Sequence, residues 1–218
     1  MAKESIAADR LSYNNQKFIF IMALQAAKKL LRAQLKETLK NLPAEEKSQQ
    51  SEIVVKKLFQ SKKYQESKRI SVYLSRDIEV DTRAVLSDIF NSGKECFVPR
   101  YDSKSTAMDM VKINSLHEFE NLPTTSWNIK QPQYSDDNFQ DALTTGGLDL
   151  IIVPGIGFTK EGHRIGNGKG YYDIYLKLCK EKLGDKFSTV ALAFQEQVVP
   201  SIPVSEYDIM IDDVIYAE

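Results

Sequence analysis

The stretch LDLIIVPGIGFTKEGHRIGNGKGYYD, from Leu148 to Asp173, decides the fold class of this chain. Its first seven residues are almost continuously apolar, which is typical of a strand that is covered on both faces. A glycine-rich loop follows at once, and then a predicted helix runs from about 170 to 183 and ends at Gly184. A buried strand followed by a loop and a helix indicates an α/β fold.

The segments on either side repeat this alternation of strands and helices. We predict two amphipathic helices near the start of the chain, a further helix between two strands, and two later strands. In chain order these are helices at 23–40 and 43–60, a strand at 69–74, a helix at 81–93, and strands at 95–99, 108–113 and 189–194. The pattern predicts a single α/β domain over residues 22–218, with an open, mostly parallel sheet and helices on both faces.

Residues 1–21 are expected to form an N-terminal extension outside that domain, and disorder is one expectation for them. The apolar run from Phe18 to Leu24 is too short to span a bilayer. Glu4 and Asp9 in the preceding segment argue against a secretory signal. Two long proline-bearing loops, at 121–138 and 196–208, are candidates for functional segments.

Composition excludes several classes of function. The formal net charge of -1 over 218 residues gives no overall positive potential that would attract nucleic acid to the protein surface. No membrane partner is expected either. Cys96 and Cys179 lack a CxxC partner and read as reduced thiols of an intracellular, cytoplasmic protein. His117 and His163 are too few for a zinc cluster, and no GxSxG motif is present.

Glycine is concentrated in the loop: six of the ten glycines lie between Gly155 and Gly170. Ligands of open α/β sheets bind beyond the carboxyl ends of strands, and backbone N–H groups at a helix start favour phosphate. The loop matches neither the P-loop pattern, because Gly170 follows Lys169, nor the GxGxxG pattern, because Tyr171 takes the place of its third glycine. We therefore predict an anion site of another kind.

Charged residues of the loop are its candidate functional groups. Lys169 is set among glycines, and we interpret it as a phosphate contact, although most lysines are solvated surface groups. Asp173 either complements the helix dipole or binds magnesium beside the phosphates. Asp208 is a candidate second carboxylate, which spacing alone does not select over Asp212 or Asp213.

The combination VPGIGFTKEGHRIGNGKGYYD, preceded by TGGLDLI, resembles the 5-formyltetrahydrofolate cyclo-ligase family. The resemblance continues in KKLLRAQL (28–35), SKRISVYLS with EVDT (79–82), MDMVKI, TSWNIKQP and ALAFQEQ. It extends from about Met22 to the C-terminus. It implies an open α/β sheet related to sugar-phosphate isomerases and CoA transferases.

The resemblance also implies an activity. Members of the family use ATP and Mg²⁺ to turn 5-formyltetrahydrofolate into 5,10-methenyltetrahydrofolate, with release of ADP and phosphate. The implied partners are ATP and a reduced folate, which can carry a polyglutamate tail, and a monomer is expected. If residues 1–21 are a transit segment, the compartment would be mitochondrial instead of cytoplasmic.

Site residues implied by the resemblance fall into four groups. Lys169, Arg164 and Tyr171 would be catalytic, and Asp173 and Asp208 would hold the metal. ATP would contact Lys28, Arg32, Arg164, Ile165, Gly166, Asn167, Gly168, Lys169, Gly170, Tyr171 and Tyr172. The folate would contact Arg32, Leu74, Glu79, Trp127, Asn167, Gly168, Lys169, Gly170 and Tyr171.

Two residues depart from the family pattern. Asn167 stands where many members carry an arginine, which removes a charge near the phosphates, and Thr159 replaces an aspartate. Two other functions stay open, the first because of Asn167 and the second because of the related fold. One is a folate- or nucleotide-binding protein without turnover, and the other is a phosphosugar isomerase of related fold.

Overall fold

The computed structural model describes residues 2–101, 105–125, 130–134, 136 and 138–218, with side chains from residue 15 onward. The helices are α1 (Ala2–Asn41), α2 (Ala44–Gln60), α3 (Lys62–Glu66), α4 (Arg83–Asn91), α5 (Leu116–Glu120), α6 (Tyr171–Leu183) and the 3₁₀ turn η1 (Gln195–Gln197). The strands are β1 (Arg69–Ser71), β2 (Glu95–Tyr101), β3 (Met108–Ile113), β4 (Leu150–Val153), β5 (Gly157–Phe158), β6 (Arg164–Ile165), β7 (Ser188–Ala193) and β8 (Asp213–Tyr216).

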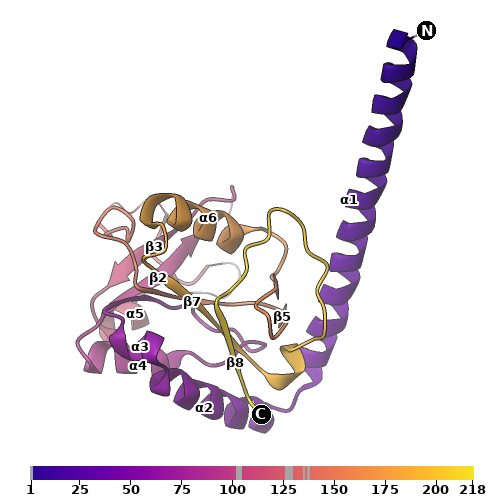
Figure 1. The fold of residues 1–218 in the computed structure, drawn as a ribbon. Helices are drawn as coiled ribbons and strands as arrows, with labels where there is room; N and C mark the ends of the chain where they lie inside the picture. The colour runs from indigo at the N-terminus through magenta and orange to yellow at the C-terminus, as the bar shows by residue number, and fades with distance from the viewer. Residues whose placement is uncertain (1, 102–104, 126–129, 135, 137) are drawn as a thin grey trace.

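Within these residues, six strands form one sheet in the order β3-β2-β1-β4-β7-β8 (Figure 1). All neighbouring pairs are parallel except β2 and β3. The register pairs Ile70 of β1 with Leu150 of β4, so strands about eighty residues apart in sequence lie side by side. The predicted fold class, an open and mostly parallel α/β sheet in a single domain, is confirmed.

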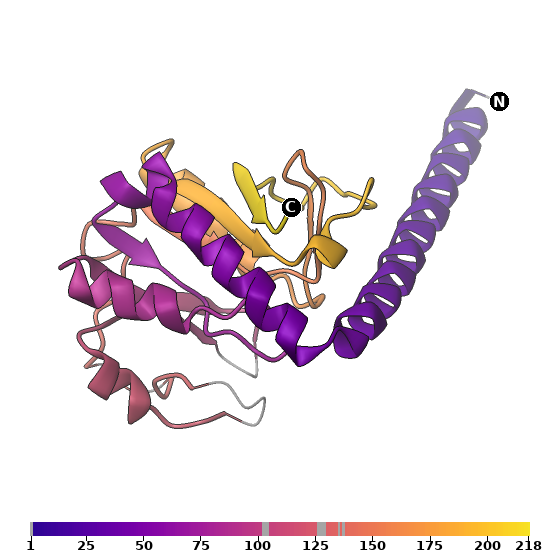
Figure 2. The same cartoon turned by 90° about the horizontal axis from the view of Figure 1, so that it is seen from below.

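Helices cover both faces of the sheet, as the apolar runs predict. Leu150 and Ile152 pack into a core cluster with α2, α3 and α4, whereas Ile151 and Val153 pack into a second cluster with α6. Figures 1 and 2 show α6 on one side of the sheet and α2 with α4 on the other. Every residue of β4 is buried, which explains its continuous apolar sequence.

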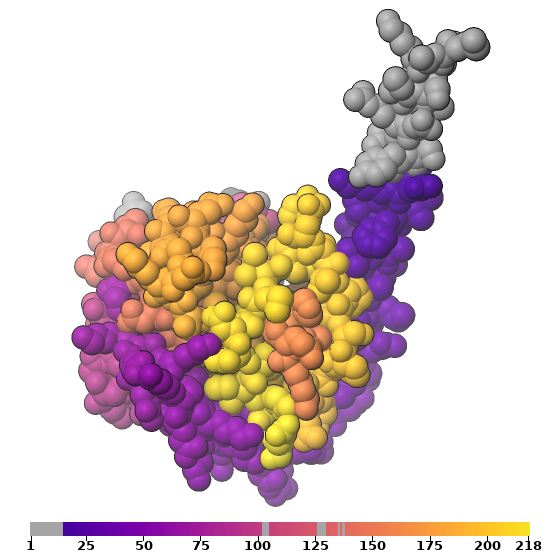
Figure 3. Space-filling view, viewed as in Figure 1, coloured from indigo at the N-terminus to yellow at the C-terminus, as the bar shows by residue number. Residues whose placement is uncertain are grey.

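The first helix is longer than the predicted span of 23–40. α1 runs without a break from Ala2 to Asn41, so residues 2–21 continue the helix that enters the domain. Leu35 and Leu39 are buried, whereas residues 15–22 are all exposed. Figure 3 shows the indigo part of the helix, which begins at residue 15, projecting beyond the body of the molecule.

Other element boundaries shift by a few residues. The strand predicted at 69–74 ends at Ser71. The helix predicted at 81–93 begins at Arg83, and the strand predicted at 95–99 continues to Tyr101. α6 ends at Leu183, and the next residue, Gly184, has a positive φ of 63°, which glycine adopts readily. The sequence analysis missed α3, α5, β8 and the small hairpin of β5 and β6.

Cys96 and Cys179 are both free thiols, as predicted, and both are buried. Burial raises the pKa of each thiol to about 12, which keeps both protonated and unreactive. No helix among the described residues has an apolar stretch that could cross a membrane.

Candidate functional site

The glycine loop leaves the carboxyl end of β4 and folds back on itself before α6. Ile156 N donates to Ile165 O at 2.7 Å, and Thr159 N donates to His163 O at 2.9 Å, which closes the hairpin of β5 and β6. Residues 166–170 then connect the hairpin to the first turn of α6. The loop therefore lies at the edge of the sheet where ligands of α/β folds bind.

Part of the glycine content serves the protein's own packing. A Cβ at Gly162, where φ is +98°, would lie 2.0 Å from the carbonyl oxygen of Ile211, and one at Gly155 would lie 2.4 Å from the ring of Phe158. Gly168 and Gly170 differ, because their Cβ atoms would have no neighbour closer than 3.4 Å and both have positive φ. Close approach of a ligand to the backbone is therefore expected only in the last part of the loop.

Arg164 is buried beneath the loop, with 4% of its side chain exposed. Its Nη2 donates to Asp173 Oδ2 at 2.7 Å, and its Nη1 donates to Pro154 O at 3.2 Å. The guanidinium also lies 5.8 Å from the ring centre of Tyr172. The carboxylate of Asp173 therefore balances the positive charge of Arg164.

The two candidate metal ligands lie close together. Ile209 N, next to Asp208 in the chain, approaches Asp173 Oδ1 at 3.4 Å. Asp208 Oδ2 accepts from Lys28 Nζ at 2.5 Å and from Ser205 N and Oγ at 2.6 and 2.9 Å. Burial by itself raises the pKa of Asp208, but the hydrogen bonds from Lys28 and Ser205 outweigh it and lower the pKa below its usual value.

Lys28 and Arg32 reach this region from α1. Arg32 Nε donates to Gly166 O at 2.9 Å, and a Cβ at Gly168 would lie 3.4 Å from Arg32 Cζ. The guanidinium thus lies against the segment in which Asn167 replaces the usual arginine. Lys28 and Arg32 are spaced i, i+4 and therefore lie on one face of α1. Because both side chains contact the domain, this face is packed against the domain and is not a solvated face.

Side chains after the hairpin divide into exposed and packed groups. Asn167 and Lys169 are exposed, and among the described residues Lys169 takes part in no ion pair. Tyr171 is half-buried, donates to Ser105 O at 3.2 Å, and its ring centre lies 4.9 Å from that of Tyr101. Tyr172 is buried and packs in the core cluster on the α6 side of the sheet. Ile165 packs with Leu35, Ile156 and Ile202.

A second group of candidate residues follows β1. Leu74 and Glu79 are almost fully buried at 9% and 8% exposure, and both line a cavity of ≈ 720 Å³ between α2 and the start of α4. Glu79 does not stand alone, because Arg76 Nη2 donates to its Oε1 at 2.7 Å. The prediction for Trp127 lies outside the described residues.

Three tyrosines lie within electrostatic range of Glu79. Burial raises the pKa of Tyr73, Tyr101 and Tyr172, and the negative charge of Glu79 adds to the rise in each case. Because β1 and β4 are parallel neighbours, the residues that follow β1 and the glycine loop that follows β4 lie at the same edge of the sheet.

The sequence analysis missed three residues of the site. Arg76 holds Glu79, Ser205 holds Asp208, and Gln197 Nε2 donates to Gly155 O at 2.8 Å beneath the loop. Only Arg76 has a sequence signal, namely its position three residues before a glutamate. No group of three or more metal-ligating side chains occurs in the described part of the chain, so the carboxylates form a pair.

Comparison with known proteins identifies relatives over nearly the whole chain. A model of the 5-formyltetrahydrofolate cyclo-ligase family matches residues 24–217. A 5-formyltetrahydrofolate cyclo-ligase of Mus musculus is 50% identical over 197 residues, which cover 90% of this chain and 97% of the mouse protein. A probable 5-formyltetrahydrofolate cyclo-ligase of Caenorhabditis elegans is 40% identical over 195 residues, covering 89% of this chain and 94% of the relative.

Solved structures agree with the fold. The solution structure of Aquifex aeolicus 5,10-methenyltetrahydrofolate synthetase superposes with a TM-score of 0.70 at 27% identity, covering 87% of this chain and 89% of the other. The synthetase of Mycoplasma pneumoniae gives a TM-score of 0.65 over 88% of this chain and 99% of its own, and at 21% identity it supports the fold alone.

Proposed function

The chain belongs to the 5-formyltetrahydrofolate cyclo-ligase family and is a ligase acting on 5-formyltetrahydrofolate, and from this premise we propose its reaction in full. The enzyme uses ATP and Mg²⁺ to form 5,10-methenyltetrahydrofolate, and it releases ADP and phosphate. Asn167 leaves the loop with one positive charge fewer, but the guanidinium of Arg32 lies against Gly166 and Gly168 and supplies a positive charge beside it.

The chemistry needs an activated formyl group. The formyl carbon on N5 is a weak electrophile because it has amide resonance, and its oxygen is a poor leaving group. Transfer of the γ-phosphoryl group of ATP to that oxygen corrects both faults and leaves ADP. N10 of the same folate then attacks the carbon, the C–O bond breaks, phosphate departs and N10 loses its proton.

In such phosphoryl transfer the protein supplies position and charge neutralisation, not a covalent nucleophile. The observation that carries the proposal is the pair of ion pairs beside the glycine loop, Lys28 with Asp208 and Arg164 with Asp173. Two cations and two carboxylates stand where phosphate oxygens and a metal would meet. Lys169 and the backbone at Gly168 and Gly170 would receive the phosphates from the solvent side.

The residues present fit a magnesium ion that arrives with the nucleotide. Mg²⁺ is usually held by one or two carboxylates plus substrate phosphates, and Asp173 and Asp208 provide two carboxylates from adjoining segments. When bound, the ion neutralises charge on the transferred phosphoryl group. Arg164, Lys28 and Ser205 hold the two carboxylates in position.

The folate would lie across the tyrosines towards Leu74 and Glu79. The carboxylate of Glu79 is an acceptor for N–H donors of the pterin, and Leu74 provides an apolar wall beside it. As the family resemblance implies, Trp127 would contact an aromatic part of the substrate.

The test is product formation by the purified chain. Given 5-formyltetrahydrofolate, ATP and Mg²⁺, it should generate the near-ultraviolet absorbance of the conjugated methenyl product together with one ADP per product. The control without ATP should remain flat. Folded protein that binds both substrates yet makes no product would favour the binding protein without turnover, and folded protein that fails to bind ATP would favour the isomerase.

The proposal places the enzyme in the cytoplasm as a monomer. The alternative is mitochondrial import through residues 1–21, and a relative from Arabidopsis thaliana that is 31% identical over 205 residues is named as mitochondrial. Fractionation of cells that express the full chain, followed by detection of the protein in the cytoplasmic or the mitochondrial fraction, distinguishes these two locations.

A further inference from the structure

Arg76 and Glu79 form a closed turn on the wall of the cavity beside Leu74. Glu79 N donates to Arg76 O at 2.9 Å, and Arg76 N donates back to Glu79 Oε2 at 3.0 Å. The guanidinium adds Nη2 to Oε1 at 2.7 Å and Nε to Oε2 at 3.3 Å. Arg76 therefore binds Glu79 through both its backbone and its side chain.

The surroundings of Glu79 make this pairing necessary. Its side chain is 6% exposed, and the groups within electrostatic range include the phenols of Tyr73, Tyr101 and Tyr172. No second cation forms an ion pair with Glu79 in the described part of the chain. A buried carboxylate that loses its only cation is strongly destabilised and changes its position or its protonation.

These contacts also determine how many acceptor positions of the Glu79 carboxylate remain free to bind a ligand. A carboxylate offers about four acceptor positions, two on each oxygen. Oε2 receives Arg76 N and Nε, and Oε1 receives Nη2, so the remaining position is on Oε1.

We propose that Arg76 is a positioning residue for folate recognition: it holds the carboxylate of Glu79 in the orientation in which Oε1 accepts one N–H donor of the pterin. This inference rests on the proposed function, because it takes Glu79 as a folate contact. Arg76 acts on the folate only through Glu79, and it has no role at the phosphates.

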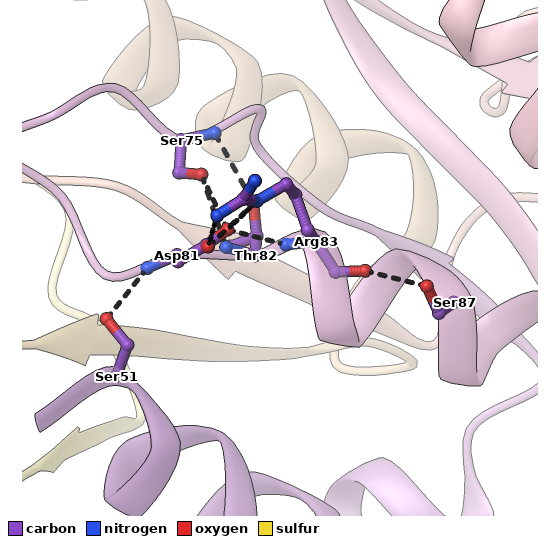
Figure 4. Close-up of polar contacts among 6 residues, drawn as sticks. All are labelled: Ser51, Ser75, Asp81, Thr82, Arg83 and Ser87. Atoms are coloured by element: carbon purple, nitrogen blue, oxygen red, sulfur yellow. Dashed lines mark hydrogen bonds and ion pairs between the residues drawn. The ribbon is translucent and has the colours of Figure 1, made fainter. Parts of the chain in front are cut away.

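Arg83 provides a matched control on the same wall. Like Arg76 it pairs with a nearby carboxylate, donating from Nη2 to Asp81 Oδ2 at 2.5 Å, but its side chain is 82% exposed. Figure 4 shows that Ser75 Oγ also donates to the Asp81 carboxylate and that the backbone N of Asp81 donates to Ser51 Oγ. The position of Asp81 therefore does not depend on one arginine.

The experiment measures 5-formyltetrahydrofolate binding by calorimetry without ATP, in the parent chain and in Arg76→Met, Arg76→Lys and Arg83→Met. We expect Arg76→Met to bind folate about 10- to 100-fold more weakly, the cost of a charge-assisted hydrogen-bond network, and to bind ATP within about 2-fold of the parent. Arg76→Lys should recover part of the loss, and Arg83→Met should stay within about 2-fold. In turnover assays the KM for folate should rise and kcat should change little.

A second pair of variants tests whether Arg76 acts through Glu79. In a Glu79→Gln background no buried charge depends on the arginine, so adding Arg76→Met should change folate affinity by less than about 2-fold. An Arg76→Met protein that binds folate as tightly as the parent, or a full additional loss in the Glu79→Gln background, overturns the inference. A parent chain that binds folate but makes no product counts against the proposed reaction alone.

Discussion

At the scale of single residues, two cations of the candidate site are already paired with its two carboxylates. Arg164 pairs with Asp173, and Lys28 pairs with Asp208. Replacing any of these four residues disturbs a partly buried ion pair, so loss of activity in such variants mixes chemistry with stability. Lys169 is a cleaner probe, because it is exposed and takes part in none of the described ion pairs.

Lys169→Ala should therefore separate nucleotide use from folding. We expect kcat/KM for ATP to fall about 10- to 100-fold, the usual range for a lost charge-assisted contact, with the melting temperature unchanged within about 1 °C. Lys177→Ala is the control, because Lys177 is also exposed and lies on α6. Equal losses in both variants, or a loss explained by a lower melting temperature, would contradict a phosphate contact at Lys169.

Single residues differ in how far the sequence could predict them. The free thiols of Cys96 and Cys179 could be predicted because neither cysteine lies in a CxxC motif. Asp173 was placed correctly in the first turn of α6 because the preceding glycines and the following helix were both clear. Arg76 was missed because its contact depends on the turn that returns Glu79 N to Arg76 O, and no periodic pattern encodes that turn.

At the scale of elements, α1 contacts both the glycine loop and the loop at 196–208. Its periodic leucines predicted a helix, but not which segment its basic residues would face. The structure turns Lys28 to Asp208 and Arg32 to Gly166, 180 and 134 residues away in sequence. Long-range pairing of this kind is decided by packing of the whole chain and is not visible in a local pattern.

The pH dependence of stability tests the contact between α1 and the loop at 196–208. The pKa of Asp208 is lowered in the folded state, so its pairing with Lys28 stabilises the protein above the unfolded pKa of about 3.9 and ceases to do so as pH falls through the folded value. Lys28→Met should therefore lower the melting temperature by about 2–4 °C near neutral pH, and by clearly less near pH 3.

Differential scanning fluorimetry across this range provides the measurement. Lys29→Met is the matched control, because Lys29 is exposed on the same helix. A Lys28→Met deficit that stays constant from neutral to acid pH would mean that the ion pair does not stabilise the docked helix.

At the scale of the molecule, strand order assembles the site. β1 and β4 are parallel neighbours, with Ile70 opposite Leu150. Leu74 and Glu79, which follow β1, therefore emerge at the same edge as the glycine loop, which follows β4. The sequence predicted that ligands would bind at a carboxyl edge, because all such sheets share that property. It did not predict which strands are adjacent, because that choice depends on how the layers pack as a whole.

The last test concerns the part of the molecule that stands outside this arrangement. Residues 15–22 are exposed along α1, and the match to the family begins at residue 24. Deleting residues 1–21 should leave kcat/KM for both substrates within about 2-fold and the melting temperature within about 2 °C, since exposed terminal segments contribute little to folding. Light scattering should give a monomer for both forms. A loss of activity on deletion, or a change from a larger assembly to a monomer, would mean that the exposed Phe18 to Met22 surface takes part in substrate binding or in self-association.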